Sequence, residues 1–240
     1  MNKLISEILH FIYPSRCVFC GEFIKDIPMR VCSECIKNLP YNKRYCNLCG
    51  RPVDTVFGDM VCADCKGRKS PFERVYVPLL YKDGVRKAII DFKYRNKRSF
   101  ARTFAIFVFA ELKNNGYFPD AVTYVPIHFL RKMKRGYCQT EILAEEIASL
   151  YGVPVLPLAK KCKYTRKLAT LSAAERRKTV KNSFKATDNK NIKDKNILLV
   201  DDIVTTSATI TECGNVIKKA YGCRLSAATV AATDKNRKMF

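Results

Sequence analysis

Two adjacent carboxylates at the end of an apolar run are the residues of this chain best placed to do chemistry. In NILLVDDIVTTSATI (residues 196–210), Asp201 and Asp202 follow the run directly, and small, mostly hydroxylated residues come next. Small side chains leave successive backbone N–H groups accessible, and the N-terminus of a following helix adds partial positive charge. We therefore predict that a phosphate monoester binds here. The predicted phosphate-binding residues are Thr205, Thr206, Ser207, Ala208 and Thr209.

The two carboxylates suit a sugar phosphate, because they can accept hydrogen bonds from vicinal hydroxyls or stabilise developing positive charge. A helix N-cap beside two surface acids is the plainer alternative, but capping needs neither both carboxylates nor four hydroxyls. The stretch contains no glycine between Ile203 and Ile210, and Ser207 stands where a glycine is expected. The Cβ of Ser207 would strain the turn if a positive φ is needed there.

Cysteines form a second group of residues with chemical potential. Eight of the twelve lie in four C-x-x-C pairs before residue 66. This spacing lets both thiolates of a pair reach one tetrahedral ion, so two pairs complete a structural zinc site. We predict two zinc ions and sequential pairing of the motifs, with interleaved pairing as an alternative. The predicted ligands are Cys17, Cys20, Cys32 and Cys35 for one ion, and Cys46, Cys49, Cys62 and Cys65 for the other.

A disulfide framework is the other interpretation of these cysteines, but it requires an oxidising compartment. The N-terminal NKLISEILHFIY has helical apolar spacing and lacks the features of an export signal, so we expect an amphipathic helix there. No apolar run approaches the roughly 20 residues that span a bilayer. We therefore expect a cytoplasmic protein.

The charge of the chain indicates a class of partner. The formal net charge is +22, and residues 160–195 hold 13 basic and 3 acidic residues. Such a field favours polyanions, which include nucleic acid, anionic membrane and phosphorylated metabolites. A solvated surface is the alternative, and charge alone does not choose among polyanions.

Alternating strands and helices must position these groups. The periodicity predicts strands over 75–81, 121–127, 153–159, 196–202 and 224–234, and helices over 84–95, 100–116, 140–152 and 209–222. This order predicts an α/β fold, a parallel sheet with helices on both faces, whose ligands sit at the carboxyl ends of the strands. Thr209 and Glu212 match a capping box. We divide the chain into a zinc-binding module at 1–66 and an α/β domain at 74–240, with a linker around 66–73.

LLVDDIVTTSAT resembles the phosphoribosyl-pyrophosphate (PRPP) loop of type I phosphoribosyltransferases. The four C-x-x-C pairs, KAIIDFKYRNKRSFA, VPIHFLRKMKRGYCQTEILA and LSAAERRKTVKNSF also occur in the order typical of the ComF family of competence-associated proteins. The resemblance covers nearly the whole chain. It implies a type I phosphoribosyltransferase-like parallel sheet flanked by helices, with a small N-terminal double zinc-ribbon module.

The resemblance also implies roles for particular residues. Asp201 and Asp202 would bind the ribose hydroxyls and act in catalysis, residues 205–209 would bind the 5′-phosphate, and Mg²⁺ would be held mainly by the ligand's own oxygens. In a transfer reaction, pyrophosphate would leave through an oxocarbenium-like state. Candidates for contacting the pyrophosphate or other phosphates are Arg131, Arg135, Gly136, Lys93, Arg95, Arg176 and Arg177, each with a solvated surface position as the alternative.

Several residues depart from the family pattern. Ser207 replaces the usual glycine, Cys138 and Thr179 replace asparagines, and Leu168 replaces a frequent glutamine. These departures preserve the ligand class but predict binding with impaired or absent turnover.

Three functions follow as hypotheses. The first is a ComF-like protein that binds PRPP and single-stranded DNA in natural transformation, together with a helicase-like partner. The second is an active phosphoribosyltransferase with an unidentified acceptor, and the third is a zinc-ribbon scaffold without turnover.

Overall fold

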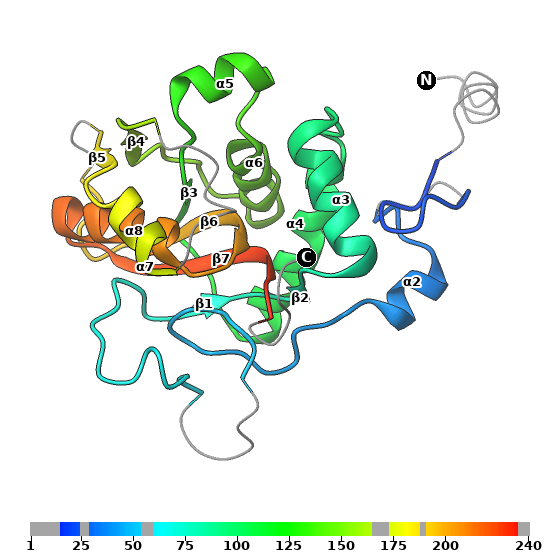
Figure 1. The fold of residues 1–240 in the computed structure, drawn as a ribbon, viewed down its shortest axis with the longest axis horizontal. Helices are drawn as coiled ribbons and strands as arrows, with labels where there is room; N and C mark the ends of the chain where they lie inside the picture. Colours follow the sequence, from blue (N-terminus) through cyan, green and yellow to red (C-terminus); the bar gives the residue numbers. More distant parts are fainter. Residues whose placement is uncertain (1–14, 25–28, 54–59, 165–172, 188–190, 235–240) are drawn as a thin grey trace.

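A parallel β-sheet with helices on both faces forms the larger part of the molecule (Figure 1). The computed structural model describes residues 15–24, 29–53, 60–164, 173–187 and 191–234. The predicted N-terminal helix and Leu168 lie outside these residues. Within them, no helix is long and apolar enough to cross a membrane.

The main sheet has five strands in the order β1-β7-β6-β3, with β2 also paired to β7, and every pairing is parallel. Its strands are β1 (Val75–Tyr76), β2 (Leu79–Leu80), β3 (Ala121–Tyr124), β6 (Asn196–Val204) and β7 (Arg224–Ala232). A separate antiparallel pair consists of β4 (Ala159–Lys161) and β5 (Phe184–Ala186). The predicted parallel sheet is therefore confirmed, and the acid pair lies near the carboxyl end of its central strand β6.

Most of the helices lie around this sheet, and α2 (Ser33–Asn38) lies apart from it in the cysteine-rich segment (Figure 1). The others are α3 (Asp83–Tyr94), α4 (Phe100–Asn114), α5 (Phe129–Arg135), α6 (Gln139–Tyr151), α7 (Ala173–Val180) and α8 (Ala208–Tyr221). Gly152 and Gly222 end α6 and α8 in the left-handed conformation, as their positions in the sequence predict. Helices α2, α5 and α7 are not among the helices that the sequence predicts.

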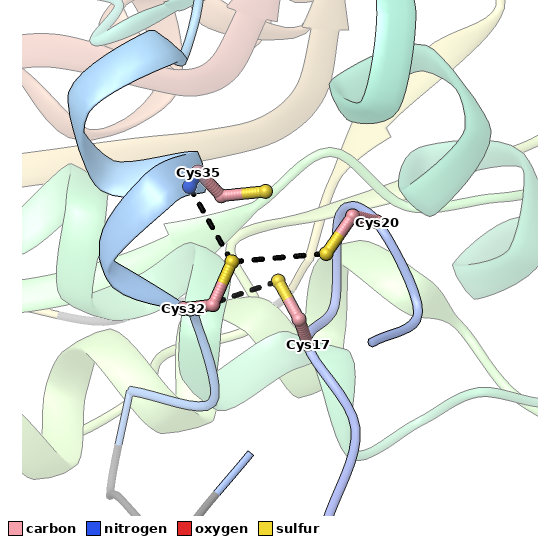
Figure 2. A group of neighbouring side chains, drawn as sticks. All are labelled: Cys17, Cys20, Cys32 and Cys35. Carbon is pink, nitrogen blue, oxygen red and sulfur yellow. Dashed lines mark hydrogen bonds between the residues drawn. The ribbon is translucent and has the colours of Figure 1, made fainter. Parts of the chain in front are cut away.

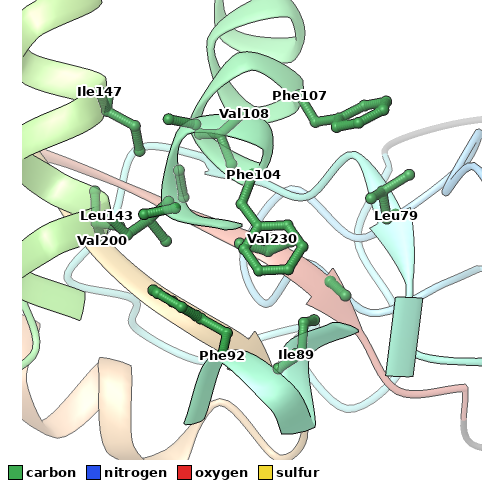
Figure 3. Packing of buried hydrophobic residues seen from close by; sticks show 14 of the residues in the cluster. Leu79, Ile89, Phe92, Phe104, Phe107, Val108, Leu143, Ile147, Val200 and Val230 are labelled. Carbon is green, nitrogen blue, oxygen red and sulfur yellow. The ribbon is translucent and has the colours of Figure 1, made fainter. Parts of the chain in front are cut away.

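Alternate residues of β6 enter two separate cores. Leu198 and Val200 pack with α3, α4 and α6, whereas Ile197 and Leu199 pack with α8 on the opposite face. Figure 3 shows the first core, in which Phe104 of α4 lies close to Phe92 of α3. Two-sided burial explains why this strand is a continuous apolar run.

Three local predictions are wrong or incomplete. Residues 75–81 form two short strands instead of one, because Pro78 has no N–H to donate between them. Residues 153–159 do not form the predicted strand. Val155 makes a single bridge to Val122, and only Ala159 belongs to a strand, as the first residue of β4. Pro154 and Pro157 limit further pairing, because proline has no N–H to donate. The predicted capping box is also wrong, because the helix begins at Ala208 and Glu212 instead accepts the N–H of Asn182 at 2.7 Å.

Candidate functional site

The loop after β6 leaves the first turn of α8 without a side-chain cap. Strand β6 ends at Val204, and α8 begins at Ala208. Ser207 occupies the N-cap position with φ of 59° and ψ of −1°, and its hydroxyl caps no helix N–H. The first N–H groups of a helix lack partners within it, so they are available to an anion. Ser207 therefore has the positive φ at which its Cβ strains the turn.

The hydroxyl of Ser207 contacts the second cysteine cluster. It donates to the carbonyl oxygen of Cys49 at 3.3 Å, across 158 residues of sequence. A cavity of about 590 Å³ lies beside this contact, lined by Thr206 and Ser207 from the loop and by Cys49 and Cys65 from the cluster. The phosphate-loop candidate and the zinc-ribbon segment are therefore in direct contact.

The two aspartates point to opposite sides of β6, as neighbouring strand residues must. Asp202 is buried, and its carboxylate accepts the Lys93 ammonium at 2.8 Å and the Gln139 amide at 2.9 Å. Asp201 is half-buried on the other side, where its carboxylate accepts the N–H of Asp202 at 2.8 Å. The two carboxylates thus have different surroundings, although they are adjacent in sequence.

These surroundings affect protonation differently. Burial and the neighbouring charge of Asp202 raise the pKa of Asp201 to about 7, and the charges of Lys93 and Lys161 offset part of this rise. Burial lowers the pKa of Lys161, and the positive charge of Arg131 adds to this effect. Burial opposes the charged form of Lys93, but its ion pair with Asp202 and the charge of Asp201 together outweigh burial and raise its pKa. The charge of Asp201 therefore changes near neutral pH.

Of the other predicted phosphate contacts, Lys93 is brought to the acid pair and Arg95 is not. Lys93 lies near the end of α3 and reaches Asp202, whereas Arg95 is exposed and pairs with Asp91 at 3.3 Å. Arg176 and Arg177 lie in α7, and the description of the structure does not extend to their side chains.

Arg131, Arg135 and Gly136 belong to α5 or follow it directly. Arg135 donates to the side-chain oxygen of Gln139, the residue that also holds Asp202, and its guanidinium lies 5.0 Å from the Tyr94 ring centroid. Gly136 ends the helix with φ of 79°. A chain of side-chain contacts therefore connects Arg135 through Gln139 to Asp202.

Sequence reasoning missed two side chains at this site, Gln139 and Lys161. Gln139 is buried and bridges Arg135 to Asp202. Its place directly after Cys138 in RGYCQ was a signal that could have identified it. Lys161 comes from β4, outside the main sheet, and its charge acts on Asp201 only because the fold brings the two together.

The cysteines form two clusters, as sequential pairing predicts. Within each, the four sulfur atoms lie within 4.8 Å of one another. All twelve cysteines of the chain are free of disulfides. Figure 2 shows the first cluster, in which the Cys20 and Cys32 sulfurs are 3.7 Å apart and the N–H of Cys35 points to the Cys32 sulfur.

The sulfur spacing fits zinc. Zn–S bonds of about 2.3 Å in a tetrahedron require sulfur atoms about 3.8 Å apart. The Cys49 and Cys62 sulfurs of the second cluster are also 3.7 Å apart, and Cys46 sulfur accepts the N–H of Cys62 at 3.3 Å. Both clusters are therefore consistent with structural zinc sites closed by four thiolates.

The clusters pack against different faces of the sheet. Cys17 and Phe19 of the first join the core of α3, α4 and α6. In the second, Gly50 lies against Val75, Val77 and Val204, which belong to the opposite core. The second cluster is thus the one that contacts the end of β6 and its loop.

Comparison with known proteins agrees with this architecture. Residues 8–66 match the family model described as a double zinc ribbon domain, and residues 133–239 match the phosphoribosyl transferase domain. Competence protein F of Haemophilus influenzae is 27% identical over 85% of this chain and 91% of its own. The DNA utilization protein YhgH of Escherichia coli K12 is 23% identical over 78% and 83%.

Among solved structures, adenine phosphoribosyltransferase from Leishmania tarentolae covers 57% of this chain and 73% of its own, with 10% identity and a TM-score of 0.37. That likeness is too distant to support an argument. The family models and the observed parallel sheet define the class of protein, a phosphoribosyltransferase-type domain joined to a double zinc ribbon. With its similarity to competence protein F and YhgH over most of their lengths, the chain belongs to the ComF family.

Proposed function

We propose that this protein binds PRPP with Mg²⁺ at the carboxyl end of β6 and handles single-stranded DNA during DNA uptake. The observation that carries the PRPP half is the pairing of two aspartates with the uncapped first turn of α8, separated by a short loop of hydroxylated residues. The helix N-terminus suits a phosphate and the carboxylates suit vicinal ribose hydroxyls. PRPP carries both groups.

Each part of the ligand has proposed partners. Backbone N–H groups and hydroxyls of residues 205–209 bind the 5′-phosphate, and Asp201 and Asp202 accept the ribose hydroxyls. Arg131, Arg135 and Lys93 contribute positive charge for the pyrophosphate, with Gln139 positioning Arg135. The ligand's own oxygens hold Mg²⁺, which neutralises charge on the pyrophosphate when bound.

Transfer of ribose 5-phosphate is the alternative activity. The favouring observation is the acid pair itself, because a carboxylate beside the ribose would stabilise an oxocarbenium-like state. The left-handed Ser207 opposes it, since its Cβ stands where the family has a glycine. Pyrophosphate release from PRPP across a panel of nucleobases and small amines tests this alternative. Release above the no-acceptor rate would establish it.

The proposal that the protein handles DNA rests on the charge of the chain and on its similarity to two known proteins. The net charge of +22 favours polyanions, and the names of two relatives refer to competence and to DNA utilization. We include a helicase-like partner of DNA uptake in the proposal because the family resemblance implies one.

Thermal unfolding tests the ligand assignment. A ligand that binds only the folded chain raises its melting temperature. With Mg²⁺ present, PRPP should raise it more than ribose 5-phosphate or pyrophosphate alone at equal concentration, because PRPP fills every proposed subsite. Equal shifts by PRPP and pyrophosphate would indicate nonspecific anion binding and contradict the proposal.

A further inference from the structure

An exposed group of aromatic and basic side chains lies between α5 and the segment after β4. We call His128, Phe129, Arg131 and Tyr164 the α5–Tyr164 surface. The rings of His128 and Tyr164 are 5.4 Å apart in an edge-to-face arrangement, and the Arg131 guanidinium lies 5.7 Å from the Tyr164 centroid. Tyr164 is 57% exposed and Phe129 62% exposed. Flat aromatic faces are therefore accessible to solvent beside a cation.

This surface carries strong positive charge. Helix α5 reads FLRKMKR, with four cations and no acid in seven residues. The segment before Tyr164 reads KKCK and adds three more cations. The acids facing this surface are Glu141, which accepts the Lys132 ammonium, and Glu145, whose charge also acts on Lys132. The local charge therefore remains positive and is complementary to a polyanion.

Two chain segments that are 36 residues apart produce this arrangement. Strand β4 ends at Lys161, and the chain continues from it to Tyr164, whose ring contacts that of His128 directly before α5. In the sequence, Tyr164 is the one tyrosine of the basic segment 160–195 and does not by itself indicate base stacking. The structure adds His128 and Phe129 to it.

We propose that the α5–Tyr164 surface binds single-stranded nucleic acid, with an unpaired base stacked on Tyr164 and the phosphates beside the cations of α5. Every base has a flat face that can stack on an aromatic ring, and a basic groove can follow the phosphates. This inference rests on the DNA half of the proposed function and names the side chains that perform it.

The position of the surface links the two halves of the proposed function. Arg131, which the proposed function assigns to the pyrophosphate, lies 5.7 Å from the centroid of the Tyr164 ring. The nucleic-acid surface therefore shares this residue with the proposed PRPP site.

Fluorescence anisotropy with two oligonucleotides of equal length tests the stacking. One carries all its bases and the other is abasic, so both present the same phosphates. Stacking contributes about 1–3 kcal/mol per base, so we expect the wild type to prefer the base-containing strand by about 5- to 150-fold. Tyr164→Ala should reduce this preference at least fivefold, whereas Tyr164→Phe should retain it.

Salt titration separates stacking from charge. Tyr164→Ala should leave the dependence of affinity on salt unchanged, because it removes no charge. Lys134→Ala should reduce the salt slope by about one and leave the base preference unchanged. PRPP titration of each variant verifies that the fold and the neighbouring site are intact.

Each contrary outcome has a different meaning. If the wild type binds no single-stranded DNA at low salt, the DNA half of the proposed function fails, and this inference fails with it. If the wild type binds DNA but Tyr164→Ala keeps the full base preference, only this inference is overturned. Equal affinity for both strands, together with binding to anionic phosphatidylglycerol vesicles that Phe129→Ser abolishes, would instead assign the surface to lipid and overturn it.

Discussion

At the scale of single residues, Ser207 has the most direct effect on the proposed phosphate site. A non-glycine residue in the left-handed region costs about 1 kcal/mol or more, and Ser207 has φ of 59°. Its hydroxyl bond to Cys49 compensates for part of this strain. This strain is the same in the free and the bound loop, so it does not change the free energy of PRPP binding. The PRPP affinity therefore depends only on how the Cβ of Ser207 contacts the phosphate.

Ser207→Gly should therefore tighten PRPP binding by about 2- to 5-fold, which corresponds to about 1 kcal/mol or less. Ser207→Ala is the matched control, because it keeps the Cβ and the strained φ but loses the bond to Cys49. Calorimetric titration of both variants separates these effects. If glycine binds no better than alanine, the loop already accommodates a side chain.

The raised pKa of Asp201 predicts a dependence on pH. With a pKa of about 7, this carboxyl is mostly neutral at pH 6 and mostly ionised at pH 8. The ionised form is the better acceptor for ribose hydroxyls, so PRPP affinity should fall by up to about tenfold from pH 8 to pH 6. Asp201→Asn should retain only the dependence that comes from the ligand's own phosphates. If PRPP affinity depends on pH identically in the wild type and in Asp201→Asn, the proposed role of the Asp201 carboxylate in binding is contradicted.

The same group affects folding stability in the opposite direction. An ordinary aspartate in the unfolded chain loses its proton near pH 4, whereas folded Asp201 keeps it to about pH 7. Between these values the folded chain binds more protons, so this residue makes stability fall as pH rises. Urea unfolding at pH 5 and pH 8 should show a smaller fall in Asp201→Asn. An equal fall would indicate that other groups cause it.

At the scale of elements, the second cysteine cluster supports the loop after β6. A Cβ on Gly50 would lie 2.5 Å from Val77 and 3.0 Å from Val75, and Gly50 has φ of 72°. Gly21 occupies the same place in the first C-x-x-C pair with φ of 84°, but nothing lies within 4 Å of its Cβ position. The two glycines share the backbone conformation and differ only in packing.

Gly50→Ala should therefore destabilise the protein by about 1–3 kcal/mol more than Gly21→Ala, because only the first adds a steric clash. Urea unfolding of the two variants measures this difference. Equal losses would show that the cluster can move away from the sheet without cost.

Loss of the second zinc and loss of the first zinc should have different effects on PRPP binding. Cys49→Ser should remove the second zinc and weaken PRPP binding, because the Cys49 carbonyl accepts the Ser207 hydroxyl. Cys20→Ser should remove the first zinc and leave PRPP affinity nearly unchanged, since that cluster packs on the face with α4. Metal analysis should give two zinc ions for the wild type and one for each variant. A wild-type content near zero would refute the zinc sites.

The elements with a strongly periodic pattern of apolar residues could be predicted from the sequence. The elements and contacts that depend on residues distant in the sequence could not. Strand β6 and helix α4 follow from their apolar patterns, and the cysteine pairing follows from short loops. Helix α5 is short, with four cations among seven residues, so its period is weak. At the site, the acid pair and Lys93 were identified from motifs, whereas Lys161 reaches Asp201 only through the fold.

At the scale of the whole molecule, the zinc ribbon and the α/β domain depend on each other. The first cluster contributes to one core of the sheet, and the second contacts the other core and the phosphate loop. Positive charge lies at one border of the proposed PRPP site, on α5 and before Tyr164. The sequence divides the chain into two domains at a linker around 66–73. Within this segment residues 66–69 are exposed, whereas Phe72 is buried against Gly214 of α8.

The central claim is that Asp201, Asp202 and the loop after them bind PRPP with Mg²⁺. Isothermal titration calorimetry of the zinc-loaded protein with PRPP and Mg²⁺ tests it most directly, on the wild type and on Asp201→Asn/Asp202→Asn. Thermal unfolding of the variant serves as the fold control, because Asp202 also holds Lys93. We predict saturable binding at one site per chain for the wild type and at least about tenfold weaker binding for the folded variant. Absence of binding by the wild type, or equal binding by both, would contradict the claim.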